Sequence, residues 1–225
     1  MRLFIATVAT LSLLSGCAKD PSKDVVAAKV TTKTAPGKAT PAPTKVAVPK
    51  AKAQPAPTAS AASKNLSGSI VFIGSKVTGS HTNRFNEWSG SISNLVPNVD
   101  AAQLKVTVKT ASAEADYLDP KPWSGKLQKH LVSDDFFSSE KFPTATFVSK
   151  SMKKTDGGLH EVTGDLTIRG KTEEIKFPAT VKTEPSFSLN AEFSINRKLF
   201  GIVYAGKADN LIRDGVVLKL ALKAD

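Results

Sequence analysis

Residues 187–195 read Phe-Ser-Leu-Asn-Ala-Glu-Phe-Ser-Ile, so that apolar and polar side chains alternate throughout the stretch. Successive side chains of a β-strand point to opposite faces of its sheet, whereas a helix brings together residues three or four apart. A strand here would bury the odd-numbered residues, including Phe193 and Ile195, and leave the even-numbered ones in water. This pattern is typical of an antiparallel sheet that covers a single core.

The same two-residue period recurs on both sides of this stretch. It appears in residues 104–109, 162–168 and 216–222. Turn-forming sequences separate the runs, and two examples are Thr155-Asp156-Gly157-Gly158 and Arg213-Asp214-Gly215. The domain therefore reads as a series of short strands joined by tight turns.

One short helix is the exception to this all-β pattern. Residues 126–132 place Leu127 and Leu131 four positions apart, the spacing at which two side chains share a helix face. About 160 residues with roughly eight strands predict an all-β domain, either a sandwich or a closed barrel. An eight-stranded barrel is just wide enough to hold one small ligand or to be filled by its own side chains, and periodicity does not separate these alternatives.

The chain begins with the features of a secretory signal. Arg2 precedes an apolar run at residues 3–14 that is too short to span a bilayer as a helix. The run leads into Leu14-Ser15-Gly16-Cys17, which resembles the lipobox at which bacterial lipoproteins are acylated on cysteine and cleaved just before it. We expect residues 1–16 to be a signal peptide and Cys17 to carry a lipid anchor. The alternative is an ordinary signal peptide with a chance cysteine.

Cys17 is the only cysteine of the chain, so the folded domain has no disulfide. Stable membrane attachment needs more than one acyl chain, which lipoprotein acylation supplies. Residue 18 is Ala, whereas Asp at this place resembles a signal for retention at the inner membrane. We therefore expect a periplasm-facing protein attached to the cell membrane through Cys17, with the outer membrane favoured if the host has one.

Residues 17–64 have the composition of a linker. They contain no aromatic residue and hold seven of the chain's 13 prolines. Such a segment cannot bury enough apolar surface to offset the entropy of ordering it. We expect a disordered tether with polyproline character, which at ~3.1 Å per residue could reach roughly 145 Å and hold a domain away from a membrane. The folded domain would then occupy residues 65–225.

The formal net charge of +11 lies mostly in this tether. Residues 18–64 carry nine lysines and two aspartates, whereas residues 65–225 carry 21 basic and 18 acidic side chains. A domain that is only weakly basic lacks the electrostatic footprint of nucleic-acid binding, and we expect no nucleic-acid partner. The tether lysines could contact an anionic lipid surface or simply keep the segment soluble.

Five parts of the domain, in an unchanged order, resemble the YceI-like family of polyisoprenoid-binding periplasmic proteins. They are residues 75–81 (SKVTGSH) running into 84–92 (RFNEWSGSI), 130–137 (HLVSDDFF) with 141–143 (KFP), 162–170 (VTGDLTIRG), 193–197 (FSINR) and 211–215 (LIRDG). The resemblance implies an extended antiparallel eight-stranded barrel of lipocalin-like form, with an apolar tunnel for an isoprenoid such as a quinone or polyprenyl tail. Residues 65–70 depart from the family, because they lack the Asp and the His-Ser step with which many members open the domain.

The resemblance also implies a set of candidate ligand-binding residues. The candidates for the apolar tunnel wall are Phe72, Phe85, Trp88, Phe147, Leu166, Ile168, Phe193, Ile195, Leu218 and Leu220. Three polar residues, His81, Arg84 and Arg197, are candidates for contact with a lipid head group at the tunnel mouth. Taken one by one, the apolar side chains could also fill a dry core, and the two arginines could be solvated strand ends.

The sequence shows no pattern for catalysis or for a metal site. Its three histidines, His81, His130 and His160, lie far apart, and the domain has no cysteine to complete a ligand set. Gly170-Lys171-Thr172 lacks the earlier glycine of a phosphate-binding loop, and no G-x-S-x-G motif occurs. We expect a non-catalytic protein without a cofactor that binds or carries an isoprenoid lipid. The alternative is a packed structural or interaction module that is presented to an envelope partner without a ligand.

Overall fold

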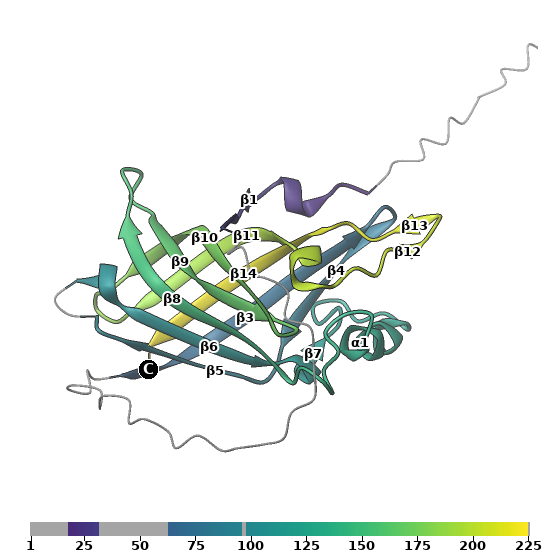
Figure 1. Ribbon diagram of the computed structural model, residues 1–225, viewed down its shortest axis with the longest axis horizontal. Coiled ribbons are helices and arrows are strands. Elements are labelled where there is room, and N and C mark those ends of the chain that lie inside the picture. Colours follow the sequence, from purple (N-terminus) through teal and green to yellow (C-terminus); the bar gives the residue numbers. More distant parts are fainter. Residues whose placement is uncertain (1–17, 32–62, 96–97, 225) are drawn as a thin grey trace, which may run out of the picture.

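Eight antiparallel strands close into a barrel in the computed structural model, which describes residues 18–31, 63–95 and 98–224 (Figure 1). Around the barrel the order is β3–β5–β6–β8–β9–β10–β11–β14, and β14 pairs again with β3. The barrel strands are β3 (Lys64–Lys76), β5 (Trp88–Ser93), β6 (Gln103–Lys109), β8 (Thr144–Lys154), β9 (His160–Ile168), β10 (Lys171–Lys182), β11 (Ser188–Asn196) and β14 (Gly215–Ala224). The prediction of an antiparallel, eight-stranded, lipocalin-like barrel is confirmed.

Shorter elements complete the described part of the chain. The strands are β1 (Val26–Ala27), β2 (Lys29–Thr31), β4 (Gly79–Phe85), β7 (Ala113–Glu114), β12 (Gly206–Lys207) and β13 (Asn210–Leu211). The helices are α1 (Ser124–Val132) and the 3-10 turns η1 (Pro21–Lys23), η2 (Val99–Ala101), η3 (Thr110–Ser112) and η4 (Arg197–Phe200). α1 includes residues 126–132, where the sequence predicts a helix. Within the described ranges, no helix has both the length and the apolar character needed to cross a membrane.

The predicted alternation of side chains is present in the barrel strands. In β9 every second residue from His160 to Ile168 is buried, and the residues between them are half-buried. Gly164 belongs to the buried set for a steric reason: a Cβ at this position would lie 2.5 Å from Cζ of Phe147 and 2.6 Å from the backbone oxygen of Val148. The absence of a side chain at Gly164 therefore lets the Phe147 ring lie against β9.

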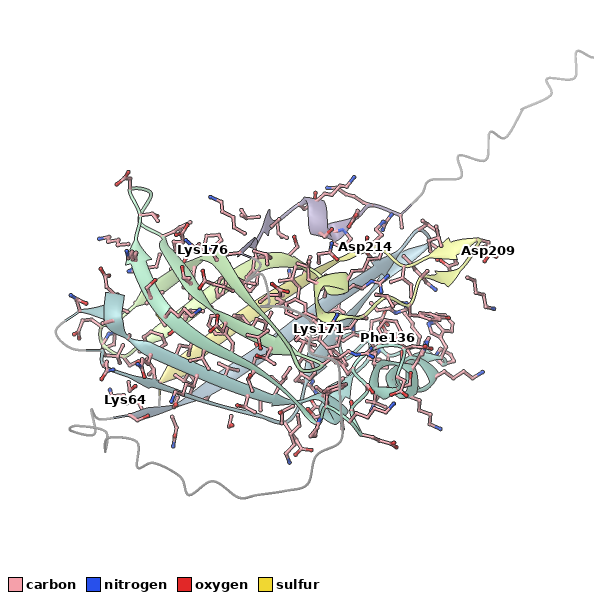
Figure 2. The ribbon with its side chains drawn as sticks, viewed as in Figure 1. Lys64, Phe136, Lys171, Lys176, Asp209 and Asp214 are labelled. Carbon is pink, nitrogen blue, oxygen red and sulfur yellow. The ribbon has the colours of Figure 1, made fainter. Side chains whose placement is uncertain are left out.

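One end of the barrel, which we call the α1 end, carries α1 together with two hairpin tips (Figure 1). The β3–β4 tip and the β12–β13 hairpin are joined there, because Thr78 Oγ1 donates to Asn210 Oδ1 at 2.8 Å and Val77 N donates to Leu211 O at 3.2 Å. Figure 2 labels Phe136 and Asp209 at this end and Lys64 at the opposite end. The α1 end is therefore built from segments that lie far apart in the sequence.

Residues 18–31 lie on the outside of the barrel, which corrects the prediction of a tether that is disordered from residue 18 onward. β1 pairs in parallel with β11, and β2 pairs antiparallel with β10. The physical reason is a seam in the barrel: β10 and β11 pair with each other only between Thr180–Lys182 and Ser188–Asn190. Beyond these pairs the two strand edges need other hydrogen-bond partners, which residues 26–31 supply. Residues 32–62 and the predicted signal peptide with Cys17 lie outside the described residues.

Candidate functional site: an apolar cavity in the barrel

A cavity of about 360 Å³ runs through the barrel interior and reaches the α1 end. Its wall takes side chains from seven of the eight barrel strands, and from β4, α1 and the segment that holds β12 and β13. Most of these side chains are aliphatic or aromatic, and among the described residues no Asp or Glu lines the wall. The volume and the apolar lining fit the usual range of small-molecule sites, about 300–1,000 Å³.

The structure brings eleven of the thirteen predicted site residues to this wall. They are Phe72, Phe85, Phe147, Leu166, Ile168, Phe193, Ile195, Leu218, Leu220, His81 and Arg197. The strands place them there because every second side chain of a barrel strand points inward. That these residues bind a lipid stays a prediction.

Trp88 and Arg84 do not line the cavity. Trp88 is half-buried and packs against the core beside Gly90. Arg84 is exposed, because His81 and Phe85 occupy the inward positions of β4 and Arg84 takes an outward one. Its Nε donates to Glu114 Oε2 at 2.6 Å, and this hydrogen bond lowers the pKa of Glu114. The structure thus places Arg84 outside the cavity and corrects its assignment to a head-group site.

Arg197 reaches the wall at the α1 end, and three of its N–H groups donate to backbone oxygens. Nε donates to Arg213 O at 3.0 Å, Nη1 to Ile202 O at 2.7 Å and Nη2 to Ile212 O at 3.2 Å. Burial lowers the pKa of Arg197, and the charge of Asp214 opposes this shift. The guanidinium therefore holds together the segment that borders the cavity, and its contact with a head group stays a prediction.

Several aromatic side chains of the wall were not predicted. Phe177 on β10 stacks on Phe193, with ring centres 4.0 Å apart and 10° between the ring planes. Phe137, in the segment after α1, contacts Phe72 edge to face at 5.6 Å. The alternation in residues 175–179 (Ile-Lys-Phe-Pro-Ala) could have indicated Phe177. Phe137 lies in an irregular segment, so no periodic signal marks it.

A cluster of three rings borders the cavity at the α1 end. The ring of His130 lies 4.9 Å from that of Phe136 and 4.9 Å from that of Tyr204. His130 Nε2 lies 2.8 Å from Asp135 Oδ2, which fixes the imidazole on the outer side of the cluster. These contacts join α1 to the segment that precedes β12, so the cavity mouth has a defined rim.

His81 is held on the wall by a carboxylate. Its Nδ1 lies 2.9 Å from Asp116 Oδ1, and Ser124 Oγ donates to the other oxygen, Oδ2, at 2.7 Å. Ser124 and His81 each bond to Asp116 and not to each other. In a catalytic triad the serine nucleophile bonds directly to the histidine that acts as its base, so this arrangement is a different one. The carboxylate orients the His81 ring and leaves Nε2 available to a ligand. In the ranges that the structure describes, no group of three His, Cys, Asp or Glu residues is placed to hold a metal ion.

The sequence matches known proteins over the barrel. The sequence profile of the YceI-like domain matches residues 56–224. A UPF0312 protein of Pseudomonas fluorescens is 32% identical over 137 residues, which cover 57% of this chain and 67% of that protein. A UPF0312 protein of Pseudomonas putida is 34% identical over 127 residues, which cover 52% of this chain and 62% of that protein. The aligned part is thus somewhat under two thirds of the second relative's length.

Two solved structures share the fold. BcnA of Burkholderia cenocepacia superimposes with a TM-score of 0.55 at 23% identity, over 69% of this chain and 96% of that one. A protein of Saccharophagus degradans described as a polyisoprenoid binding domain gives a TM-score of 0.56 at 15% identity, over 74% of this chain and 99% of that one. Since the YceI-like domain accounts for residues 56–224 of 225, and the barrel has the fold of these proteins, the chain belongs to the YceI-like family.

Proposed function

We propose that this protein binds one long-chain isoprenoid lipid, of the quinone or polyprenyl type, inside the barrel and acts without catalysis. The observation that carries the proposal is the apolar cavity of about 360 Å³ that opens at the α1 end. Burial of each CH₂ group of a ligand chain contributes ~0.8 kcal/mol, so the apolar wall supplies the driving force for binding. The Saccharophagus protein described as a polyisoprenoid binding domain has the same fold and supports this ligand class.

The cavity volume argues against the alternative of a packed module. Protein interiors have few voids larger than a water molecule. Among the side chains that face this cavity, Leu218 and Leu220 are only half-buried although they point into the barrel. A barrel that served only as a scaffold would fill this space with larger side chains, whereas a lipid-binding barrel leaves it for the ligand.

The polar residues of the wall indicate where a head group would lie. Lys76, His81, Lys207 and Asn210 line the cavity at the α1 end. Within the described part of the chain, no carboxylate pairs with Lys76 or Lys207. These side chains offer hydrogen-bond donors, which suit a head group that accepts hydrogen bonds, as a quinone carbonyl does. The proposed ligand therefore has its head at the α1 end and its tail among the rings of Phe147, Phe177 and Phe193.

We also propose that the protein is an envelope lipoprotein, exported through residues 1–16 and acylated on Cys17. The support is the sequence: a short apolar signal that ends in Leu14-Ser15-Gly16-Cys17, and no other cysteine in the chain. Acyl chains on Cys17 would hold the protein on the periplasmic face of a membrane, where isoprenoid lipids are within reach. The outer membrane is favoured by Ala18.

The test is mass spectrometry of the organic extract of the full chain, purified from a bacterial envelope. The expected result is about one isoprenoid molecule per protein, together with an intact mass that includes acyl chains on Cys17. If the extract contains no lipid, even after the protein has been incubated with quinone and polyprenyl lipids, the binding proposal is overturned. The packed structural or interaction module would then be the better explanation. The intact mass tests the lipoprotein proposal separately.

A further inference from the structure

The N-terminal strap, by which we mean residues 18–31, starts at the α1 end. Ala18 N donates to Val77 O at 3.1 Å, at the tip of the β3–β4 hairpin. The guanidinium of Arg213 donates to the backbone oxygens of Ala18 and Lys19, and its Nε lies 3.7 Å from Asp20 Oδ2. Arg213 and Val77 thus fix the first described residues of the chain beside the cavity mouth.

The strap then runs along the barrel and enters the seam between β10 and β11 (Figure 1). Val26 pairs with Phe193, Ala28 N donates to Ser194 O at 2.8 Å, and Val30 pairs with Ile175. Because these contacts use the backbone, the strap has a defined register on the barrel. The position of Ala18 is therefore set by the fold and not by a free tether.

Cys17 precedes Ala18 in the chain, and consecutive Cα atoms lie about 3.8 Å apart. If Cys17 carries acyl chains, as proposed above, the lipid anchor is one residue away in the chain from Ala18, which lies beside the cavity mouth. The charge and hydrophobicity of this end then decide whether it suits a membrane surface.

The α1 end exposes apolar side chains. Seven large apolar residues are exposed in the described part of the chain, and four of them lie at this end: Leu118, Trp123, Val203 and Leu211. Leu118 and Trp123 come from the loop before α1. Val203 precedes the β12–β13 hairpin, and Leu211 belongs to it. A rim of exposed leucine, valine and tryptophan suits the boundary between lipid head groups and acyl chains.

Cationic side chains accompany these apolar residues. α1 contains Lys126 and Lys129 and no acidic residue. Lys126 and Lys129 are exposed, and no carboxylate of the described residues pairs with them. Lys76 and Lys207 add unpaired positive charge at the cavity mouth itself. Lysines near anionic lipid contribute favourably to membrane binding.

We propose that the α1 end is a membrane-contact surface and that the N-terminal strap holds it against the bilayer. This inference rests on the proposed acylation of Cys17. The cavity mouth would then face the lipid phase directly, and an isoprenoid could move between bilayer and barrel without crossing water. The sequence predicts that residues 17–64 hold the domain away from the membrane as a long tether. In this proposal the strap instead holds the barrel against the membrane.

The experiment measures tryptophan quenching on vesicles. The acylated full chain is reconstituted into vesicles of phosphatidylethanolamine and phosphatidylglycerol that contain a brominated phosphatidylcholine, which quenches only tryptophans within the bilayer. The variant W88F keeps Trp123 as the sole tryptophan. The control W88F/W123F/L159W places the sole tryptophan in the β8–β9 turn, away from the α1 end, where Leu159 is also exposed. We expect quenching to be severalfold stronger for Trp123 than for the tryptophan at position 159.

A second pair of variants tests the strap. A Cβ on Gly215 would clash with Oγ of Ser22 and would lie 2.6 Å from Cβ of the same serine. Apart from the residues next to Gly215 in the chain, it would meet no other atom within 4 Å. G215A should therefore displace the strap, leave the barrel folded and reduce the quenching of Trp123 on the W88F background. Adding S22G removes both clashing atoms and should restore the quenching. Circular dichroism checks that the barrel is folded in each variant.

The outcomes separate this inference from the proposed function. Equal or absent quenching at the two positions, on a protein that carries acyl chains and yields an isoprenoid, would overturn the membrane contact and leave the proposed function intact. Unchanged quenching in G215A would overturn the role of the strap. Strong quenching of Trp123 on an acylated protein without an isoprenoid would support the contact and refute the ligand. A chain without acyl groups would overturn both the anchor and the inference.

Discussion

Phe177 and Phe193 stack face to face across the seam where the backbones of β10 and β11 separate, with ring centres 4.0 Å apart. The register that pairs Thr180 with Asn190 would, if continued, set Phe177 opposite Phe193. Backbone pairing stops before that point, and the ring stack bridges the two strands inside the barrel. Outside, Val26 of the strap pairs with Phe193. The seam is thus closed by aromatic contact on one side and by backbone pairing on the other.

This geometry predicts that Phe193→Ala destabilises the barrel strongly. Phe193 is nearly fully buried, and its removal would lose the stack and enlarge the cavity. Phe→Ala changes in a core cost about 3–5 kcal/mol, which urea unfolding followed by circular dichroism would measure. Val148→Ala, on the exposed face of β8, is the control and should change the free energy of unfolding by less than about 0.5 kcal/mol. A similar small loss for Phe193→Ala would show that the stack does not close the seam.

Gly164→Ala should also destabilise the protein, although it adds only one methyl group. The new Cβ would meet the Phe147 ring and the backbone oxygen of Val148 at 2.5–2.6 Å, so β8 and β9 would have to separate. We expect a loss of about 1–3 kcal/mol in the free energy of unfolding. Gly157→Ala in the β8–β9 turn is the matched control, because its Cβ meets nothing within 4 Å. Equal stability of the two variants would contradict the close approach seen at Gly164.

The sequence predicted the parts of the site whose signal is local. Alternation within a strand identifies inward residues such as Leu166 and Ile195, because the period of two is a property of the strand itself. The partner of an arginine is not a local property: Arg84 pairs with Glu114, and Arg197 with three backbone carbonyls, through contacts that only the fold creates. For the same reason, composition alone predicted a disordered tether at residues 18–31, where the structure has the ordered strap. Its order comes from the free edges of β10 and β11, more than 140 residues away in the sequence.

Replacement of Arg197 tests its structural role. Arg197→Met would leave three backbone carbonyls without their donor, and buried groups without a partner cost about 1–3 kcal/mol each. We expect a clear fall in the midpoint of thermal unfolding. Lys198→Met is the control, since the neighbouring Lys198 makes an exposed ion pair with the same Asp214, and such pairs contribute about 0–1 kcal/mol. Unchanged stability of Arg197→Met together with weaker lipid binding would instead support Arg197 as a head-group contact.

Stability should fall in mildly acidic solution because of His160. Burial, and then the charge of Lys154, lowers the pKa of His160 from its usual 6.5, whereas Asp100 opposes the shift. As the pH falls through 6.5 the unfolded chain gains a proton that the folded chain does not take up, so protonation favours unfolding. The stability that the protein gains from keeping His160 neutral is thus present above pH 6.5 and is lost as the pH falls below it. His160→Gln should flatten the pH profile of the free energy of unfolding, and Lys154→Gln should flatten it partly. An unchanged slope in His160→Gln would assign the acid sensitivity to other groups.

Filling the cavity distinguishes a lipid-binding barrel from a packed one. Leu218 faces the cavity from β14, between Phe72 on β3 and Phe193 on β11 in the strand register. If the space is kept for a ligand, Leu218→Trp adds apolar volume where there is room. The delipidated variant should then keep the unfolding midpoint of the delipidated wild type, while the lipid recovered per protein before delipidation falls severalfold. If side chains already fill the interior, the same change would overpack it and cost about 1–3 kcal/mol. Ala221→Trp, on the exposed face of the same strand, adds the same indole outside the barrel and should alter neither the lipid content nor the unfolding midpoint. A destabilised Leu218→Trp whose lipid content equals that of the Ala221→Trp control would therefore argue for a packed core and against the cavity as the lipid site.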